Sequence, residues 1–163
     1  MKRCLPVLLV FCLLICGCDT ASVRLKEPVT FYYVQSDYTT DLSSPLGTEQ
    51  REAAGHRDDL SYLLALYLMG PSQENLVSPL PAGTQIFSVQ ETEPGIRITL
   101  SDTTNQLTDG EFSLACACLT LTCLDMTNAE VITITSGKRS VSMSRNNLVL
   151  FDSGTPATTE ETT

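Results

Sequence analysis

The apolar positions along the chain follow two periods, one typical of strands and one typical of helices. Residues 96–101 alternate, with Ile96, Ile98 and Leu100 on one face, which predicts a strand buried on that face alone. Other segments are rich in β-branched and aromatic residues and are also predicted to be strands. These segments are 29–35, 85–91 and 131–135, with shorter candidates at 49–53 and 148–151.

Two segments carry apolar residues at helical spacing. The stripe in residues 57–69 recurs at i, i+3, i+4, i+7 and i+8, and it consists of Leu60, Leu63, Leu64, Tyr67 and Leu68. Gly70 and Pro71 follow and predict the end of this helix. The second helix is predicted to run to about residue 124. It begins after Thr108, which forms with Glu111 the S/T-x-x-E pattern of a capping box.

Proline and glycine mark the connections between these elements. Residues 76–83 contain Pro79, Pro81 and Gly83 and are expected to form a rigid loop. Residues 93–96 place proline and glycine at the second and third positions, which predicts a type II turn. The resulting order is strand, helix, strand, strand, helix, strand. It indicates the α+β class, as a two-layer sandwich in which two helices cover one face of a mixed or antiparallel sheet.

The first residues have the pattern of an export signal. Lys2 and Arg3 precede an apolar run that is too short to span a membrane. The run ends in Ile15–Cys18 (ICGC), which resembles the lipobox of bacterial lipoproteins. This resemblance implies that Cys18 carries a diacylglyceryl group, and that cleavage just before Cys18 removes residues 1–17 as a signal peptide. The alternative is an ordinary secretory signal cut close to the same place, with Cys18 left as a free thiol.

Composition divides the remaining chain into a tether, a folded domain and a tail. Residues 18–27 are a polar tether, which would hold the domain within about 30 Å of the membrane. Residues 28–151 contain all the predicted elements and are expected to form one domain. Residues 152–163 are rich in Thr, Glu and Pro, which predicts disorder. The net charge of −9 over 163 residues argues against nucleic-acid binding.

The residue types that support catalysis or metal binding do not form a recognised pattern. His56 precedes a predicted helix and is expected to be an exposed loop residue. Three helical cysteines cannot pair within their helix, and we expect them to pack as small hydrophobic side chains; they are Cys116, Cys118 and Cys123. A polar loop lacks the glycine and the distal glutamate of a calcium loop, and its residues are Asp102, Asn105 and Asp109. We therefore expect no enzymatic activity, cofactor or metal.

Short blocks between residues 29 and 137 resemble a known family. The most specific block is Gly70–Pro71 followed by residues 78–84 (SPLPAGT). Weaker blocks are Phe31–Tyr33 with Arg51, residues 119–122 and residues 131–137. Together they resemble the GerMN domain of exported lipoproteins in endospore-forming bacteria. The resemblance implies a small α+β domain, similar to the ring-building motifs of secretion systems, that serves in protein interaction and assembly.

The lipobox and this resemblance predict a non-catalytic protein that is lipid-anchored at the extracytoplasmic face of the cell membrane. Its partners would be the membrane, through the anchor, and an envelope protein complex of sporulation or spore germination. The alternative is a lipoprotein that binds cell-wall glycan or a small ligand on the same scaffold. Such a site would be lined by aromatic side chains, for which the candidates are Tyr32, Tyr33, Tyr38, Tyr62 and Tyr67.

Overall fold

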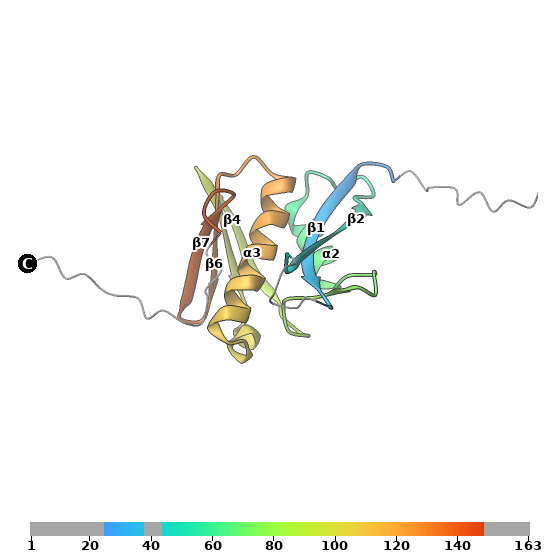
Figure 1. Ribbon diagram of the computed structural model, residues 1–163. Coiled ribbons are helices and arrows are strands. Elements are labelled where there is room, and N and C mark those ends of the chain that lie inside the picture. The colour runs from blue at the N-terminus through green and yellow to red at the C-terminus, as the bar shows by residue number, and fades with distance from the viewer. Residues whose placement is uncertain (1–24, 38–43, 149–163) are drawn as a thin grey trace, which may run out of the picture.

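The computed structural model describes residues 25–37 and 44–148, and its strands form two sheets with a helix between them (Figure 1). The first sheet has the order β2-β1-β3 and the second the order β4-β5-β6-β7. The elements are β1 (Pro28–Gln35), β2 (Leu46–Glu52), α2 (Leu60–Leu68), β3 (Leu76–Val77), β4 (Ile86–Thr92), β5 (Gly95–Leu100), the 3-10 helix η1 (Asp102–Gln106), α3 (Asp109–Met126), β6 (Val131–Ser136) and β7 (Arg139–Ser144). The predicted α+β class is confirmed, but the strands are divided between two sheets where one was expected.

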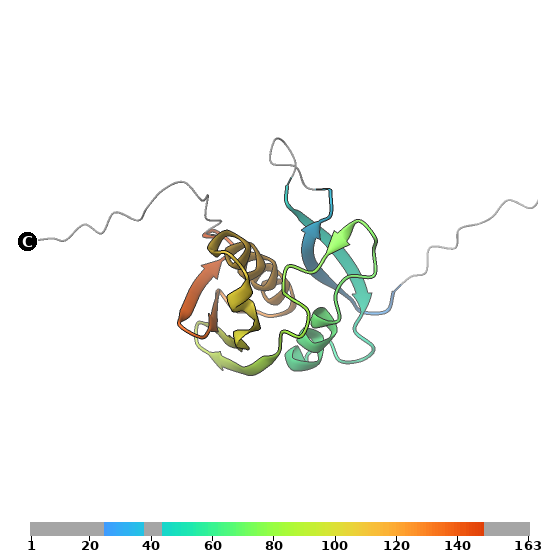
Figure 2. The same ribbon diagram turned by 90° about the horizontal axis from the view of Figure 1, so that it is seen from below.

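Helix α3 is the layer that the two sheets share (Figures 1 and 2). It contacts β1 on one side and β6 and β7 on the other. Twelve of its 18 residues are buried, whereas a helix that covers a single sheet buries only one stripe. Most of the buried residues are small, since they include two alanines, three cysteines, a serine and two threonines. Small side chains let both sheets approach the helix closely.

The side chains of α3 also cover the open edge of β1. Strand β3 pairs only with the last two residues of β1, so the rest of this edge has no neighbouring strand in the described structure. There the backbone N–H of Tyr32 donates to the Thr122 hydroxyl at 3.0 Å. The Tyr32 hydroxyl donates to Asp125 at 2.8 Å, and Asp125 forms an ion pair with Arg145 after β7. A helix that covers a strand edge in this way prevents further pairing there.

The second sheet is mixed, because β5 and β6 are parallel while β4 and β7 pair antiparallel at its two sides. The predicted alternation in β5 is confirmed: Ile96, Ile98 and Leu100 are buried. Strand β7 was not predicted. Its buried Met143 and half-buried Val141 alternate with serines, and serine is a weak strand signal.

The turn between β4 and β5 differs from the predicted type II turn. Thr92 pairs with Gly95, and the Glu93–Pro94 peptide bond is cis. The turn therefore spans residues 92–95 with proline at the third position, as in type VI turns. Gly95 is the first residue of β5, where a Cβ atom would lie 2.1 Å from the Val131 carbonyl oxygen. The glycine thus permits the close approach of β5 to β6.

Both helices begin with a side-chain cap. The predicted capping box of α3 is confirmed: the Thr108 N–H donates to the Glu111 carboxylate at 2.8 Å, and the Glu111 N–H donates to the Thr108 hydroxyl at 3.3 Å. Helix α2 begins three residues later than predicted, because Asp59 is its cap and accepts from the Tyr62 N–H. Gly70 directly follows Met69, the C-cap of α2. Its φ of 81° lies in the left-handed region, which favours glycine.

Several predictions fall wholly or partly on residues that the structure does not describe. Residues 1–17 and 152–163 lie outside the described residues, as does most of the 18–27 tether. Of the candidate strand at 148–151, only Leu148 is described, and it packs against the core. Within the predicted 76–83 loop, Leu76 and Val77 form the short strand β3.

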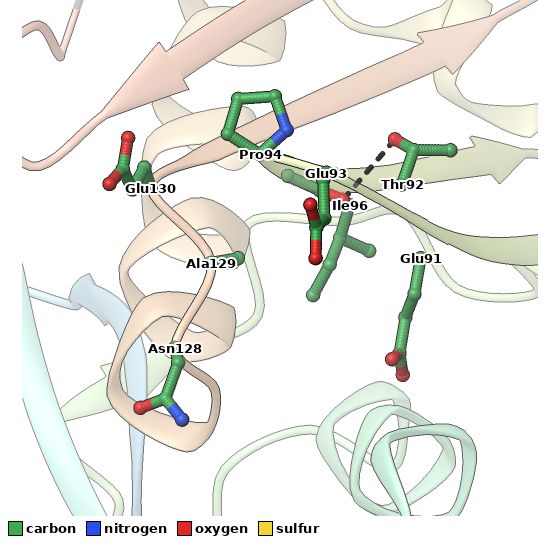
Figure 3. A pocket seen from close by; sticks show the side chains of 9 residues that line it. Glu91, Thr92, Glu93, Pro94, Ile96, Asn128, Ala129 and Glu130 are labelled. Carbon is green, nitrogen blue, oxygen red and sulfur yellow. Dashed lines mark hydrogen bonds between the residues drawn. The ribbon is translucent and has the colours of Figure 1, made fainter.

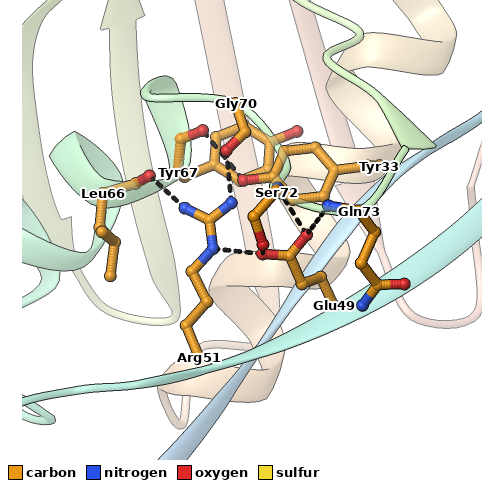
Figure 4. A network of polar contacts seen from close by, with 8 residues as sticks. All are labelled: Tyr33, Glu49, Arg51, Leu66, Tyr67, Gly70, Ser72 and Gln73. Atoms are coloured by element: carbon orange, nitrogen blue, oxygen red, sulfur yellow. Dashed lines mark hydrogen bonds and ion pairs between the residues drawn. The ribbon is translucent and has the colours of Figure 1, made fainter. Parts of the chain in front are cut away.

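Arg51 of β2 holds the end of α2 (Figure 4). Its guanidinium donates to the carbonyl oxygens of Leu66, at 3.1 Å, and Gly70. These carbonyls lie where a helix runs out of its own backbone donors. The guanidinium also lies over the Phe31 ring, 5.4 Å from its centroid, and 5.9 Å from that of Tyr33. A single charged side chain therefore joins β2, β1 and α2.

Glu49 balances this charge and fixes the segment that follows α2. It is 3% exposed and forms an ion pair with Arg51 at 2.5 Å. Its carboxylate also accepts the backbone N–H groups of Ser72 and Gln73, at 2.8 and 3.1 Å. Burial alone would raise the pKa of Glu49, but the Arg51 and Ser72 hydrogen bonds and the backbone N–H groups outweigh it, so the pKa is lowered.

We predict that Glu49→Gln lowers the free energy of unfolding by about 3 kcal/mol at pH 7, because it leaves Arg51 without its buried counter-charge. A carboxyl whose pKa is lowered by folding stabilises the fold above its unfolded pKa and loses this effect as pH falls through the folded value. The difference between wild type and variant should therefore shrink below about pH 4.5, the ordinary pKa of glutamate. Urea unfolding of the wild type and the variant from pH 7 to pH 3 measures this difference in the free energy of unfolding.

The matched control is Glu52→Gln, on the same strand but exposed. It should change the unfolding free energy by less than about 0.5 kcal/mol. Equal losses in both variants, or a loss for Glu49→Gln that does not depend on pH, would contradict the account of this network.

Candidate interaction surface

The candidate nucleophiles and bases among the described residues do not lie together: the cysteines are buried in the core, and the histidine lies in an exposed loop. His56 is an exposed loop residue, as predicted, and its ring stacks on Tyr62 with centroids 4.2 Å apart. Cys116, Cys118 and Cys123 are buried free thiols. Burial raises the pKa of each to about 12, so they are almost fully protonated at neutral pH. The prediction that they pack as hydrophobic side chains is confirmed, while Cys18 lies outside the described residues.

A basic side chain of β7 binds the backbone of the polar loop around η1. Arg139 of β7 donates to the carbonyl oxygens of Leu107, at 3.2 Å, and Thr104. It also lies 3.9 Å from the Asp109 carboxylate and 4.0 Å above the Phe112 ring. In the described part of the chain, no group of three or more His, Cys, Asp or Glu residues is placed to hold a metal ion.

The candidate aromatic residues do not form a common pocket. Tyr33 and Tyr67 are fully buried and stack with centroids 4.9 Å apart, so they belong to the core. Tyr32 is bound to Asp125, and Tyr62 lies on the surface of α2. Tyr38 lies outside the described residues. The sequence pattern that suggested a ligand pocket is therefore mostly explained by packing.

A hollow beside the β4–β5 turn contains three glutamates, but they do not converge (Figure 3). Glu91, Glu93 and Glu130 come from β4, the turn and the segment before β6. Their carboxylates point in different directions in Figure 3. This arrangement offers neither a pair of carboxylates for acid–base chemistry nor a set of cation ligands.

An apolar groove lies between α2 and β4. Its volume is about 500 Å³, and it is lined mainly by aliphatic and aromatic side chains: Leu64, Ala65, Leu68, Ile86, Phe87 and Val89. None of its lining residues is charged. Phe87 is 65% exposed, which is unusual for a large aromatic side chain on a strand. The groove therefore combines an uncharged lining with an exposed aromatic side chain.

The backbone of β4 forms one wall of this groove and is open to pairing. Among the described strands, β4 pairs only with β5. A bulge between Ile86 and Ser88 leaves Phe87 outside the ladder. The exposed side chains of β2 are all polar, namely Thr48, Gln50 and Glu52, whereas those of β4 include the aromatic Phe87 beside polar Gln90, Glu91 and Thr92. Phe87 was not singled out from the sequence, because it lies two residues from Val89 and fits the alternation, and the bulge that displaces it has no sequence signal.

Comparison with known proteins gives fold similarity only. No protein-family model matches the sequence, and no curated protein matches it. None of the helices in the described ranges is long and apolar enough to cross a membrane.

Solved structures that resemble the chain include one from Clostridium perfringens and one from Bacillus subtilis. A Clostridium perfringens protein assigned as a lipoprotein is 17% identical, with 73% of this chain and 87% of that chain covered and a TM-score of 0.47. The tandem GerMN domains of the sporulation protein GerM from Bacillus subtilis give a TM-score of 0.51 at 13% identity. That match covers 69% of this chain and 39% of the tandem, so the chain spans well under half the length of that structure. The predicted resemblance is confirmed at the level of structure: the described part of this chain has the fold of a GerMN domain.

Proposed function

We propose that this chain is a non-catalytic lipoprotein, anchored through Cys18 at the extracytoplasmic face of the cell membrane. Its domain acts as a protein-interaction module in an envelope complex of sporulation or spore germination. The observation that carries the proposal is the exposed apolar groove with its open strand edge, because exposed apolar surface beside a free edge is typical of protein-binding sites.

The chemistry of the domain supports binding over turnover. Its thiols are protonated and buried, its histidine lies in an exposed loop, and Arg51 and Arg139 are held by backbone carbonyls. The sporulation setting rests on the fold shared with the GerM tandem and on the lipobox in residues 15–18. A glycan- or ligand-binding role has less support, because the tyrosines proposed for it are dispersed.

The anchor is tested by Cys18→Ser in the native host. The thioether-forming sulfur is then absent, so the chain should no longer incorporate labelled palmitate and should keep residues 1–17 uncleaved. Cys16→Ser is the matched control, since it changes a cysteine of the same motif that would be removed with the signal peptide. Unchanged labelling of the Cys18→Ser chain would contradict the assignment.

The role in spores is tested by deletion and complementation. Deletion should reduce the yield of heat-resistant spores or their rate of germination. The wild-type gene should restore the spore yield and germination rate, and the Cys18→Ser gene should not, because the domain would lack its lipid anchor. Normal spores in the deletion strain would contradict the sporulation role and favour the glycan- or ligand-binding alternative.

A further inference from the structure

We infer that the groove between α2 and β4 binds an extended, positively charged segment of a partner protein, which adds to β4 as a further strand. The inference rests on the proposed interaction role and names its surface and the chemistry of the partner. The segment would carry an apolar residue opposite Val89 and a lysine or arginine two residues away, opposite Glu91.

The geometry of β4 sets this spacing. Val89 and Glu91 pair with Ile98 and Ile96 of β5, both of which are buried. Side chains two residues apart on a strand share a face, so Val89 and Glu91 lie on the inner face of the sheet, where Val89 lines the groove. A strand added to the edge of β4 would place its own alternate side chains on the same face. The apolar one would meet Val89, close to Phe87 at the bulge, and the next would meet Glu91.

The charges around the groove favour a basic partner. The groove lining is uncharged, and exposed carboxylates outnumber exposed basic groups on the flanking segments: Asp58 and Asp59 against Arg57 before α2, and Glu91 and Glu93 against Arg97 on the β4–β5 hairpin. In Figure 3 the Glu91 side chain extends away from Glu93 and Glu130, and no ion pair is recorded for it among the described residues. A second copy of this chain, with its own net charge of −9, would be repelled by the same field.

The test is photo-crosslinking in living cells of the native host, with the full-length lipidated chain. Benzoylphenylalanine replaces Phe87, and in a matched control it replaces Gln50 on the polar edge of β2. The Phe87 position should give an adduct that the Gln50 position does not. Mass spectrometry of the adduct should place the attached residue in a segment with Lys or Arg two residues from an apolar residue.

Charge reversal then tests whether a basic residue of the partner lies opposite Glu91. Glu91→Lys should lower the adduct yield at least about five-fold, because like charges would face each other. Glu52→Lys, the same change on the exposed side of β2, should leave the yield within about two-fold. Replacing the identified basic residue of the partner by glutamate should restore the adduct with Glu91→Lys. Since Glu91 is exposed, the thermal unfolding temperature should stay unchanged.

Three results would overturn the inference: no adduct from the Phe87 position, an adduct with a second copy of this chain, or a yield unaffected by Glu91→Lys. None of these decides the proposed function, which depends on the spore phenotype of the deletion strain. If deletion causes a spore defect but Phe87 gives no adduct, the proposed function would stand, and the partner would bind another surface of the domain.

Discussion

The structure depends on the burial of α3 from two sides. A helix flanked by two sheets cannot keep a polar face, so its sequence is apolar or small almost all round. Thr122 and Asp125 satisfy polar groups of β1, which β3 is too short to cover. The helix thereby takes the place that further strands would have in a continuous sheet, and this explains why the strands separate into two sheets.

The strand edges differ in what they present. The edge of β1 is covered by α3, the edge of β2 presents polar side chains, and β7 ends the second sheet with serines and a single bridge from Ser144 to Asn147. The edge of β4 keeps an exposed aromatic residue, Phe87. The other wall of its groove is α2, whose end is held by Arg51 and Glu49. A buried ion pair outside the groove therefore sets the shape of the surface proposed to bind a partner.

Local signals in the sequence predicted the elements but not their assembly. The capping box at Thr108, the alternation in β5 and the glycine after α2 depend on neighbouring residues, and all three are found. Strand β7 was missed because serines dilute its apolar pattern. The division into two sheets could not be predicted, since it depends on Thr122 meeting Tyr32 across 90 residues. The candidate surface could not be placed from the sequence, because the choice of β4 required the sheet order.

The most direct test of the central claim, that α3 joins both sheets into one unit, is the reactivity of its three thiols across a urea titration. Labelling of Cys116, Cys118 and Cys123 is resolved by mass spectrometry and compared with unfolding followed by circular dichroism. The account predicts slow labelling of all three in the native protein, because they are buried and protonated. Their rates should rise together at the global transition. Immediate labelling of the native protein, or exposure of one thiol well before the others, would contradict it.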